Sequence, residues 1–194
     1  MLEERGRVGR PRSERARAAV LHAVDDLLVE IGYAAMTMKG IAEKAGVGRQ
    51  TVYRWWSTKA EILFEASAAD ASHELAVEPT GEALDDLVAY LEALVHFLTR
   101  SPAGAAYRAL LGEAQHDVAV AELLASKDIL GDSARTVIER VVREDTPSIP
   151  VDLATALLIG PAFFWITSGR DPARLVAREL AETFLRELRI REPR

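Results

Sequence analysis

Residues 37 to 63 combine two short predicted helices, a glycine-bounded turn and a group of cationic and aromatic side chains. From about residue 48 to 55, helical periodicity turns Val52 and Trp56 inward. It leaves five residues pointing away: Arg49, Gln50, Thr51, Tyr53 and Trp55. Arg and Gln make paired hydrogen bonds to base edges, while Thr and Tyr hydroxyls bond phosphate oxygens. The pattern indicates a short helix that enters the major groove of DNA.

The elements around this helix are marked by their capping residues. Thr37 can cap a preceding helix that carries Ile41 and Ala45 on one face, and Gly46 can end it in the left-handed region. Thr58 and Glu61 have the spacing of a capping box, which predicts the start of a longer helix. Together these signals predict a helix-turn-helix followed by a connecting helix.

Lys59 lies in the first turn of that connecting helix. The helix dipole disfavours a cation there by roughly 0.3 to 1 kcal/mol. A phosphate held by the ammonium and by free backbone N–H groups would reverse the sign. We therefore interpret Lys59 as a phosphate clamp.

Charge divides the chain into two parts. Residues 1 to 60 hold 11 basic and 7 acidic residues, a net charge of +4, and residues 61 to 194 hold 13 basic and 23 acidic residues, a net charge of −10. Since an acidic surface repels DNA, the basic N-terminal part should face the duplex. The chain has no cysteine, which agrees with a cytoplasmic location without disulfides.

The first twelve residues hold four arginines among glycines and a proline, a composition that resists folding alone. We expect residues 1–12 to form a flexible basic arm. Either the arm lies along a DNA groove, with Arg10 and Arg12 the best-placed side chains, or it is a solvated terminus.

The remainder of the chain has helical periodicity and almost no strand signal. Helices are expected from Thr58 to about Ala76, over 84–98, around 107–111, from Val118 to Arg143 with a possible interruption at Gly131, over 153–169, and over 175–188. The charge-free run 153–169 is shorter than a membrane span and contains Pro161, so we expect a buried helix with a kink. Its large apolar residues cannot all face one direction, which implies a second buried surface.

Signals of catalysis are weak in this sequence. The four histidines are scattered over separate predicted helices, and no pair has metal-binding spacing. We find no glycine-rich phosphate loop after a strand and no nucleophile elbow. We expect no enzymatic activity, no metal and no cofactor.

Residues 13 to 64 resemble the N-terminal domain of the tetracycline-repressor (TetR) family of transcriptional regulators. The likeness rests on a long first helix that ends near Gly32-Tyr33 and on a run of matching positions: Thr37, Ile41-Ala42, Ala45-Gly46-Val47, Tyr53, Trp56 and Lys59. The resemblance implies that Thr51, Tyr53 and Lys59 contact phosphates, that Arg49 and Gln50 face bases, and that Lys39 reaches from the preceding helix. Thr37 and Trp55 complete the set of candidate DNA-binding residues.

The resemblance also implies an all-α fold of about nine helices. It comprises a helix-turn-helix domain over 13–57 and a helical regulatory and dimerisation domain over 58–194. The last two helices would form a homodimer, so that two recognition helices about 34 Å apart read a pseudo-palindrome. A pocket for a small, largely apolar ligand is implied, and the candidate lining residues are Phe97, Tyr107, Leu111, Phe164 and Trp165.

The predicted function is a sequence-specific, ligand-responsive, homodimeric repressor that binds double-stranded DNA. Repression is favoured over activation because occluding a promoter requires only binding. The alternative is an architectural or protein-controlled DNA-binding protein that takes no ligand. Loss of operator binding on addition of a ligand would distinguish the two.

Overall fold

The computed structural model describes residues 9–142 and 149–188, and within these ranges every regular element is a helix. The all-α prediction is confirmed. In chain order the elements are α1 (Gly9–Ala35), α2 (Met38–Lys44), α3 (Arg49–Tyr53), α4 (Lys59–Glu74), α5 (Ala83–Arg100), α6 (Pro102–Glu113), α7 (Val118–Ala125), α8 (Ile129–Val142), α9 (Val151–Thr167), the 3-10 helix η1 (Pro172–Arg174) and α10 (Ala177–Leu188).

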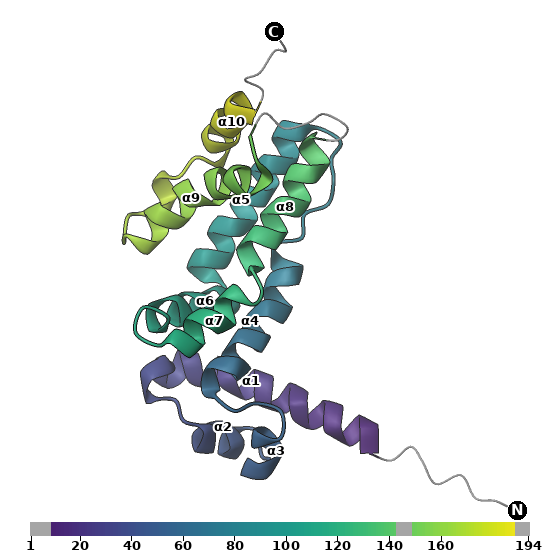
Figure 1. The fold of residues 1–194 in the computed structure, drawn as a ribbon, viewed down its shortest axis with the longest axis vertical. Coiled ribbons are helices and arrows are strands. Elements are labelled where there is room, and N and C mark those ends of the chain that lie inside the picture. Colours follow the sequence, from purple (N-terminus) through teal and green to yellow (C-terminus); the bar gives the residue numbers. More distant parts are fainter. Residues whose placement is uncertain (1–8, 143–148, 189–194) are drawn as a thin grey trace, which may run out of the picture.

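The molecule is elongated, with its N-terminal helices at one end and the larger helical part above them (Figure 1). Helices α1, α2 and α3 form the lower end, and α4 rises from them into the larger helical part beside α8. Helix α6 lies above α1 and packs against both α1 and α4. Helix α4 is therefore shared by the two parts, and its first and last turns lie in different surroundings.

One apolar core runs through both parts. It begins where Val20, Val24 and Leu27 of α1 pack toward α4, which contributes the fully buried Ile62 and Leu63. The predicted apolar stripe of α5 is buried as expected, with Leu87, Leu91, Leu94 and Leu98 all inaccessible to solvent. This core sets the position of α4 relative to the N-terminal helices.

The helix predicted from Val118 to Arg143 is in fact two helices, and the break is not at Gly131. Helix α7 ends at Ala125, and Asp128 caps the first turn of α8 by accepting a hydrogen bond from the Gly131 N–H at 2.9 Å. A Cβ added at Gly131 would approach the Asp128 carboxylate within 1.9 Å. The glycine therefore allows the cap, and the cap starts a new helix.

The N-terminal segment is helical earlier than expected. Helix α1 starts at Gly9, so residues 9 to 12 of the expected arm belong to a helix, while residues 1–8 lie outside the described residues. The regular part of α1 ends at Gly32, whose φ of 74° is in the left-handed region. That end agrees with the predicted boundary at Gly32-Tyr33.

Helix α9 is continuous from Val151 to Thr167 although Pro161 lies inside it. The exposed side of α9 carries Pro161 together with Leu153, Leu157 and Phe164, whereas Ala154, Leu158 and Ala162 are buried. The expected buried helix is thus buried on one side only within a single chain. Over the described ranges, no helix has the length and apolar character needed to cross a membrane.

Candidate nucleic-acid interface

The turn between α2 and α3 is built by backbone geometry and one side-chain cap. Thr37 is the N-cap of α2, and its Oγ1 accepts a hydrogen bond from the Gly40 N–H at 3.0 Å. Helix α2 ends at Lys44, Gly46 takes a φ of 65°, and the Val47 N–H donates to the Ala42 carbonyl at 3.0 Å. The predicted cap and glycine stop are both present, and they set α3 directly after α2.

Helix α3 is only one and a half turns long, and its two sides differ sharply in exposure. Val52 is fully buried, while Arg49 and Gln50 are exposed and Tyr53 keeps 55% of its surface accessible. Thr51 is half-buried beside them. The exposed side therefore presents a cation, an amide and a phenol, which are groups that hydrogen-bond to bases and phosphates.

Two tryptophans follow α3 directly and pack against each other. Trp56 is buried, and the edge of one indole packs on the face of the other, with ring centroids of Trp55 and Trp56 5.4 Å apart. Trp55 is half-buried and lines a hollow with Glu14, Arg17 and Glu65. Trp55 was expected to point outward, but its large apolar ring gains more from packing on Trp56. It therefore lies apart from the exposed row of α3.

Arg54 is a further cationic side chain at this surface, in addition to the candidate DNA-binding residues expected from the sequence. It is exposed, and its guanidinium lies 4.8 Å from the centroid of the Trp55 ring. Stacking on an aromatic ring restricts the guanidinium while leaving its N–H groups free to donate. Its position next to Tyr53 was the available signal for this second cation.

Glu65 of α4 contacts both the helix-turn-helix and α1. Its carboxylate accepts a hydrogen bond from Trp56 Nε1 at 3.0 Å and forms an ion pair with Arg17 of α1 at 2.8 Å. The hydrogen bond to Glu65 raises the pKa of Arg17. The Glu65 carboxylate thus connects three parts of the chain: α1, α4 and the segment that follows α3.

Lys59 lies at the junction of α1 and α4, in contact with backbone rather than at an open surface. Its ammonium donates to the carbonyl of Tyr33 at 2.8 Å and to that of Met36 at 3.1 Å, and it lies 4.2 Å from the centroid of the Tyr33 ring. Burial, with a smaller effect of the negative Glu113 and Asp117, raises the pKa of Tyr33 to about 12. Since an ammonium has three N–H donors, two of the three are used inside the protein.

The other two lysines of this domain differ in their engagement. Lys39 is exposed and approaches Glu43 within 3.5 Å on the surface of α2. Lys44 is paired with Glu30 at 2.5 Å and Asp26 at 3.7 Å, and the hydrogen bond to Glu30 raises its pKa. Lys44 therefore fastens α2 to α1, whereas Lys39 stays at the surface where it was expected.

The residues expected to line a ligand pocket do not form one group. Phe97 is fully buried, and its ring centroid lies 6.3 Å from that of the half-buried Tyr107; Leu111 is half-buried one turn further along α6. Phe164 is 61% exposed, and Trp165 donates its indole N–H to the Asp171 carbonyl at 2.8 Å. The guanidinium of Arg170 lies over both of these rings on the surface of the protein.

The fold and this site define a class of protein: a helix-turn-helix DNA-binding domain joined by one shared helix to a larger helical domain. Residues 20–66 match the family model of bacterial regulatory proteins of the TetR family, and residues 77–185 match a tetracycline-repressor-like C-terminal domain. The chain belongs to the TetR family of transcriptional regulators. It is a DNA-binding regulator, and regulators of this family function as dimers.

Individual relatives agree with this assignment. The chain is 31% identical to an HTH-type transcriptional regulator of Bacillus subtilis, YdeS, over 93% of this chain and 89% of that protein. It is 37% identical to the DNA-binding transcriptional repressor TetR of Mycobacteroides abscessus, over 43% of this chain and 44% of that protein. Among solved structures, the TetR-family regulator SCO0332 superimposes with a TM-score of 0.68 at 27% identity, covering 89% of this chain and 98% of that one.

Proposed function

We propose that this regulator is a homodimeric repressor in which α3 of each subunit reads one half of a pseudo-palindromic operator. The observation that supports it is the exposed row on α3, where Arg49, Gln50 and Tyr53 project from a helix whose opposite side is buried through Val52. Arg49 and Gln50 hydrogen-bond to base edges, and Thr51 and Tyr53 hold phosphates. Because its target is DNA, the protein acts in the cytoplasm.

Three cations complete the contact with the backbone of the duplex. Lys39 on α2 and Arg54 directly after α3 are both exposed. Lys59 contributes its third N–H to a phosphate near the first turn of α4, while its other two hold the end of α1. Thr37 acts through the helix start that it caps, which orients Lys39. Each cation adds sequence-independent affinity that weakens with salt.

The exposed side of α9 supplies the dimer surface, together with α10. Leu153, Leu157 and Phe164 are 49%, 41% and 61% exposed and recur at helical spacing on one side of α9. Gly160 lies among them, and a Cβ added there would meet no atom within 4 Å. Exposed apolar side chains in one row indicate a protein contact, and a small residue in the row lets a second helix approach closely. This surface accounts for the surplus of apolar residues in α9.

A small molecule regulates DNA binding by favouring one arrangement of the two recognition helices. The support is the path of α4, which begins at the DNA-binding part and ends against α8 in the larger domain (Figure 1). A ligand changes operator affinity only if it binds one arrangement more tightly than the other.

Selection of bound duplexes from a random DNA pool by the purified protein, followed by sequencing, tests the proposed function. We expect a two-fold-symmetric site whose half-sites are separated by about one helical turn. Enrichment of an asymmetric site would contradict binding by a symmetric homodimer. The absence of any enrichment at low salt would contradict sequence-specific binding. The selected duplex then serves as the probe for variants of the DNA-binding residues.

A further inference from the structure

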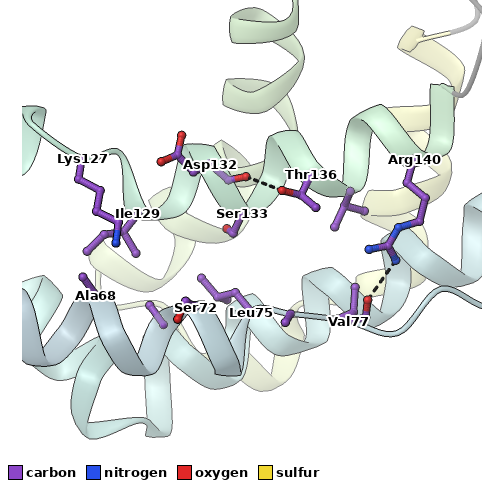
Figure 2. A pocket seen from close by; sticks show the side chains of 13 residues that line it. Ala68, Ser72, Leu75, Val77, Lys127, Ile129, Asp132, Ser133, Thr136 and Arg140 are labelled. Carbon is purple, nitrogen blue, oxygen red and sulfur yellow. Dashed lines mark hydrogen bonds between the residues drawn. The ribbon is translucent and has the colours of Figure 1, made fainter.

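A cleft of about 290 Å³ lies between the C-terminal half of α4 and the length of α8, and it contains none of the residues expected to bind a ligand. Figure 2 shows the two helices as its walls, with side chains from both directed into the space between them. Its volume is near the lower end of the range for small-molecule sites. It is therefore large enough for one compact ligand.

The floor and rim of this cleft differ in chemistry. The floor consists of buried apolar side chains from both walls: Ala68, Ala71, Leu75, Ile129 and Val137. The rim is polar, with hydroxyls of Ser72 and Thr136 that already donate to the Ala69 and Asp132 carbonyls. An apolar floor removes hydrocarbon from water, and a polar rim orients whatever head group the ligand carries.

Charged groups at the two ends of the cleft are not equivalent. Arg140 at one end donates to the Val77 carbonyl at 3.0 Å and lies 3.8 Å from the buried Asp86, so its charge is compensated within the protein. Lys127 at the other end comes from the segment between α7 and α8, and its ammonium extends toward α4 near Ala68 (Figure 2). The Asp132 carboxylate points away from α4 in the same view.

Lys127 differs from the other lysines of the chain. The sequence has four lysines, of which Lys39, Lys44 and Lys59 each have a carboxylate or carbonyl partner. Lys127 is the only lysine after residue 59, in a part of the chain whose other twelve basic residues are arginines. Lys127 is exposed, and among the described residues no hydrogen bond or ion pair engages its ammonium. A cation with this placement attracts an anion over an apolar floor.

We propose that this cleft binds a compact amphipathic carboxylate, with its apolar body on the floor and its carboxylate on Lys127. The inference rests on the proposed ligand-dependent regulation and adds the site and the chemical class of the ligand. The ligand would contact α4 and α8 at once. Its binding is thereby linked to the position of α4, whose first residue, Lys59, holds the end of α1.

Equilibrium dialysis of the full-length protein with 2-naphthoate and with octanoate, each compared with its uncharged amide, tests the site. The variants are Lys127→Gln, which removes the cation, and Thr136→Trp, which fills the cleft from its exposed rim. Arg174→Gln is the matched control, because it removes one exposed cation from η1, outside the cleft.

We expect at least one of the two carboxylates to bind the unmodified protein and the Arg174→Gln control equally, at one molecule per chain. Lys127→Gln should weaken that binding about tenfold or more, the usual effect of losing a charge-assisted hydrogen bond, and should leave binding of the amide unchanged. Thr136→Trp should abolish binding of both the carboxylate and the amide. No binding by either carboxylate, or equal binding by Lys127→Gln, would overturn the proposal.

Affinity for the selected duplex, measured on the same proteins with and without the carboxylate, separates this proposal from the function on which it rests. An unmodified protein that binds the selected duplex but neither carboxylate would refute the cleft and leave the DNA-binding function intact. A carboxylate that binds through Lys127 without changing DNA affinity would refute the link to α4. A protein that binds the carboxylate but selects no DNA would refute the proposed function alone.

Discussion

Trp56 Nε1 donates a hydrogen bond to the Glu65 carboxylate across the junction between the helix-turn-helix and α4, at 3.0 Å. The same carboxylate holds Arg17 of α1 at 2.8 Å. A direct side-chain contact therefore couples α4 to the segment that follows α3. The position of the recognition helix depends on this contact as well as on the apolar core beneath it.

Replacing Glu65 by Leu should lower the free energy of unfolding by about 1 kcal/mol, because it removes the acceptor for an indole N–H and a partially exposed ion pair. Affinity for the selected duplex should fall, since the change misplaces α3 and with it the proposed base contacts of Arg49 and Gln50. Urea unfolding and binding to the selected duplex measure the two effects. Glu65→Gln keeps an acceptor for Trp56 and should lie between; if it equals Glu65→Leu, the ion pair with Arg17 is the more important contact.

Replacing Lys59 by Met should destabilise the protein by about 1 to 2 kcal/mol, since two carbonyl groups lose their donor. It should also lower the slope of log affinity against log salt by about one unit if the third N–H contacts a phosphate. Affinity measured over a range of salt concentrations tests the second effect independently of stability. A destabilised protein with an unchanged slope would restrict Lys59 to holding α1 against α4.

Arg49→Ala and Tyr53→Phe should have different consequences for sequence preference. Loss of a paired contact to a guanine costs about 1 to 3 kcal/mol at one base position, so Arg49→Ala should relax the preference there. Loss of the Tyr53 hydroxyl should weaken binding to all duplexes by a similar factor. Repeating the selection with each variant provides the measurement. A uniform loss from Arg49→Ala would show that this residue contacts the backbone.

Leu157→Glu should convert the dimer to a monomer, because it places a charge in the apolar row of α9. DNA affinity should then fall steeply, since a monomer holds only one half-site. Sedimentation equilibrium gives the oligomeric state. Val118→Glu is a matched control, as Val118 of α7 is an apolar residue that is 75% exposed. Monomers in both variants, or in neither, would refute the α9 surface.

Asp25 of α1 should make the protein less stable as pH rises toward neutrality. Burial, with the negative charge of Asp70 and against the opposing effect of His22, raises the pKa of Asp25 to about 6, and its Oδ1 is buried without a hydrogen bond. The folded state therefore binds this proton more tightly than the unfolded chain. The stabilising contribution is present below about pH 4 and is lost as pH rises through about 6.

Asp25→Asn cannot ionise and should raise the free energy of unfolding at pH 7.5 by about 1 kcal/mol, a value reduced for the partial exposure of the carboxyl group. At pH 4 the two proteins should differ little. Urea unfolding at both pH values provides the comparison. Asp26→Asn is the control, because Asp26 is exposed and paired with Lys44, and it should give no stabilisation. Equal gains at both pH values would contradict the raised pKa.

Local signals in the sequence determined the elements of the DNA-binding part. Thr37, Gly46 and Thr58 act on backbone groups within three or four residues, so their effects can be read without knowledge of the fold. The periodicity that buried Val52 is likewise a property of one helix. These short-range effects were enough to predict the helix-turn-helix and the exposed row on α3.

Only the tertiary structure decided the partners of Lys59, the packing of Trp55 and the location of the cleft. Lys59 meets carbonyls 23 and 26 residues earlier in the chain, and Trp55 lines a hollow with residues of α1 and α4. The cleft joins Ala68 to Lys127, which are neighbours only because α4 and α8 lie side by side. Contacts between distant segments depend on how helices pack, and a pattern within one helix carries no information about them.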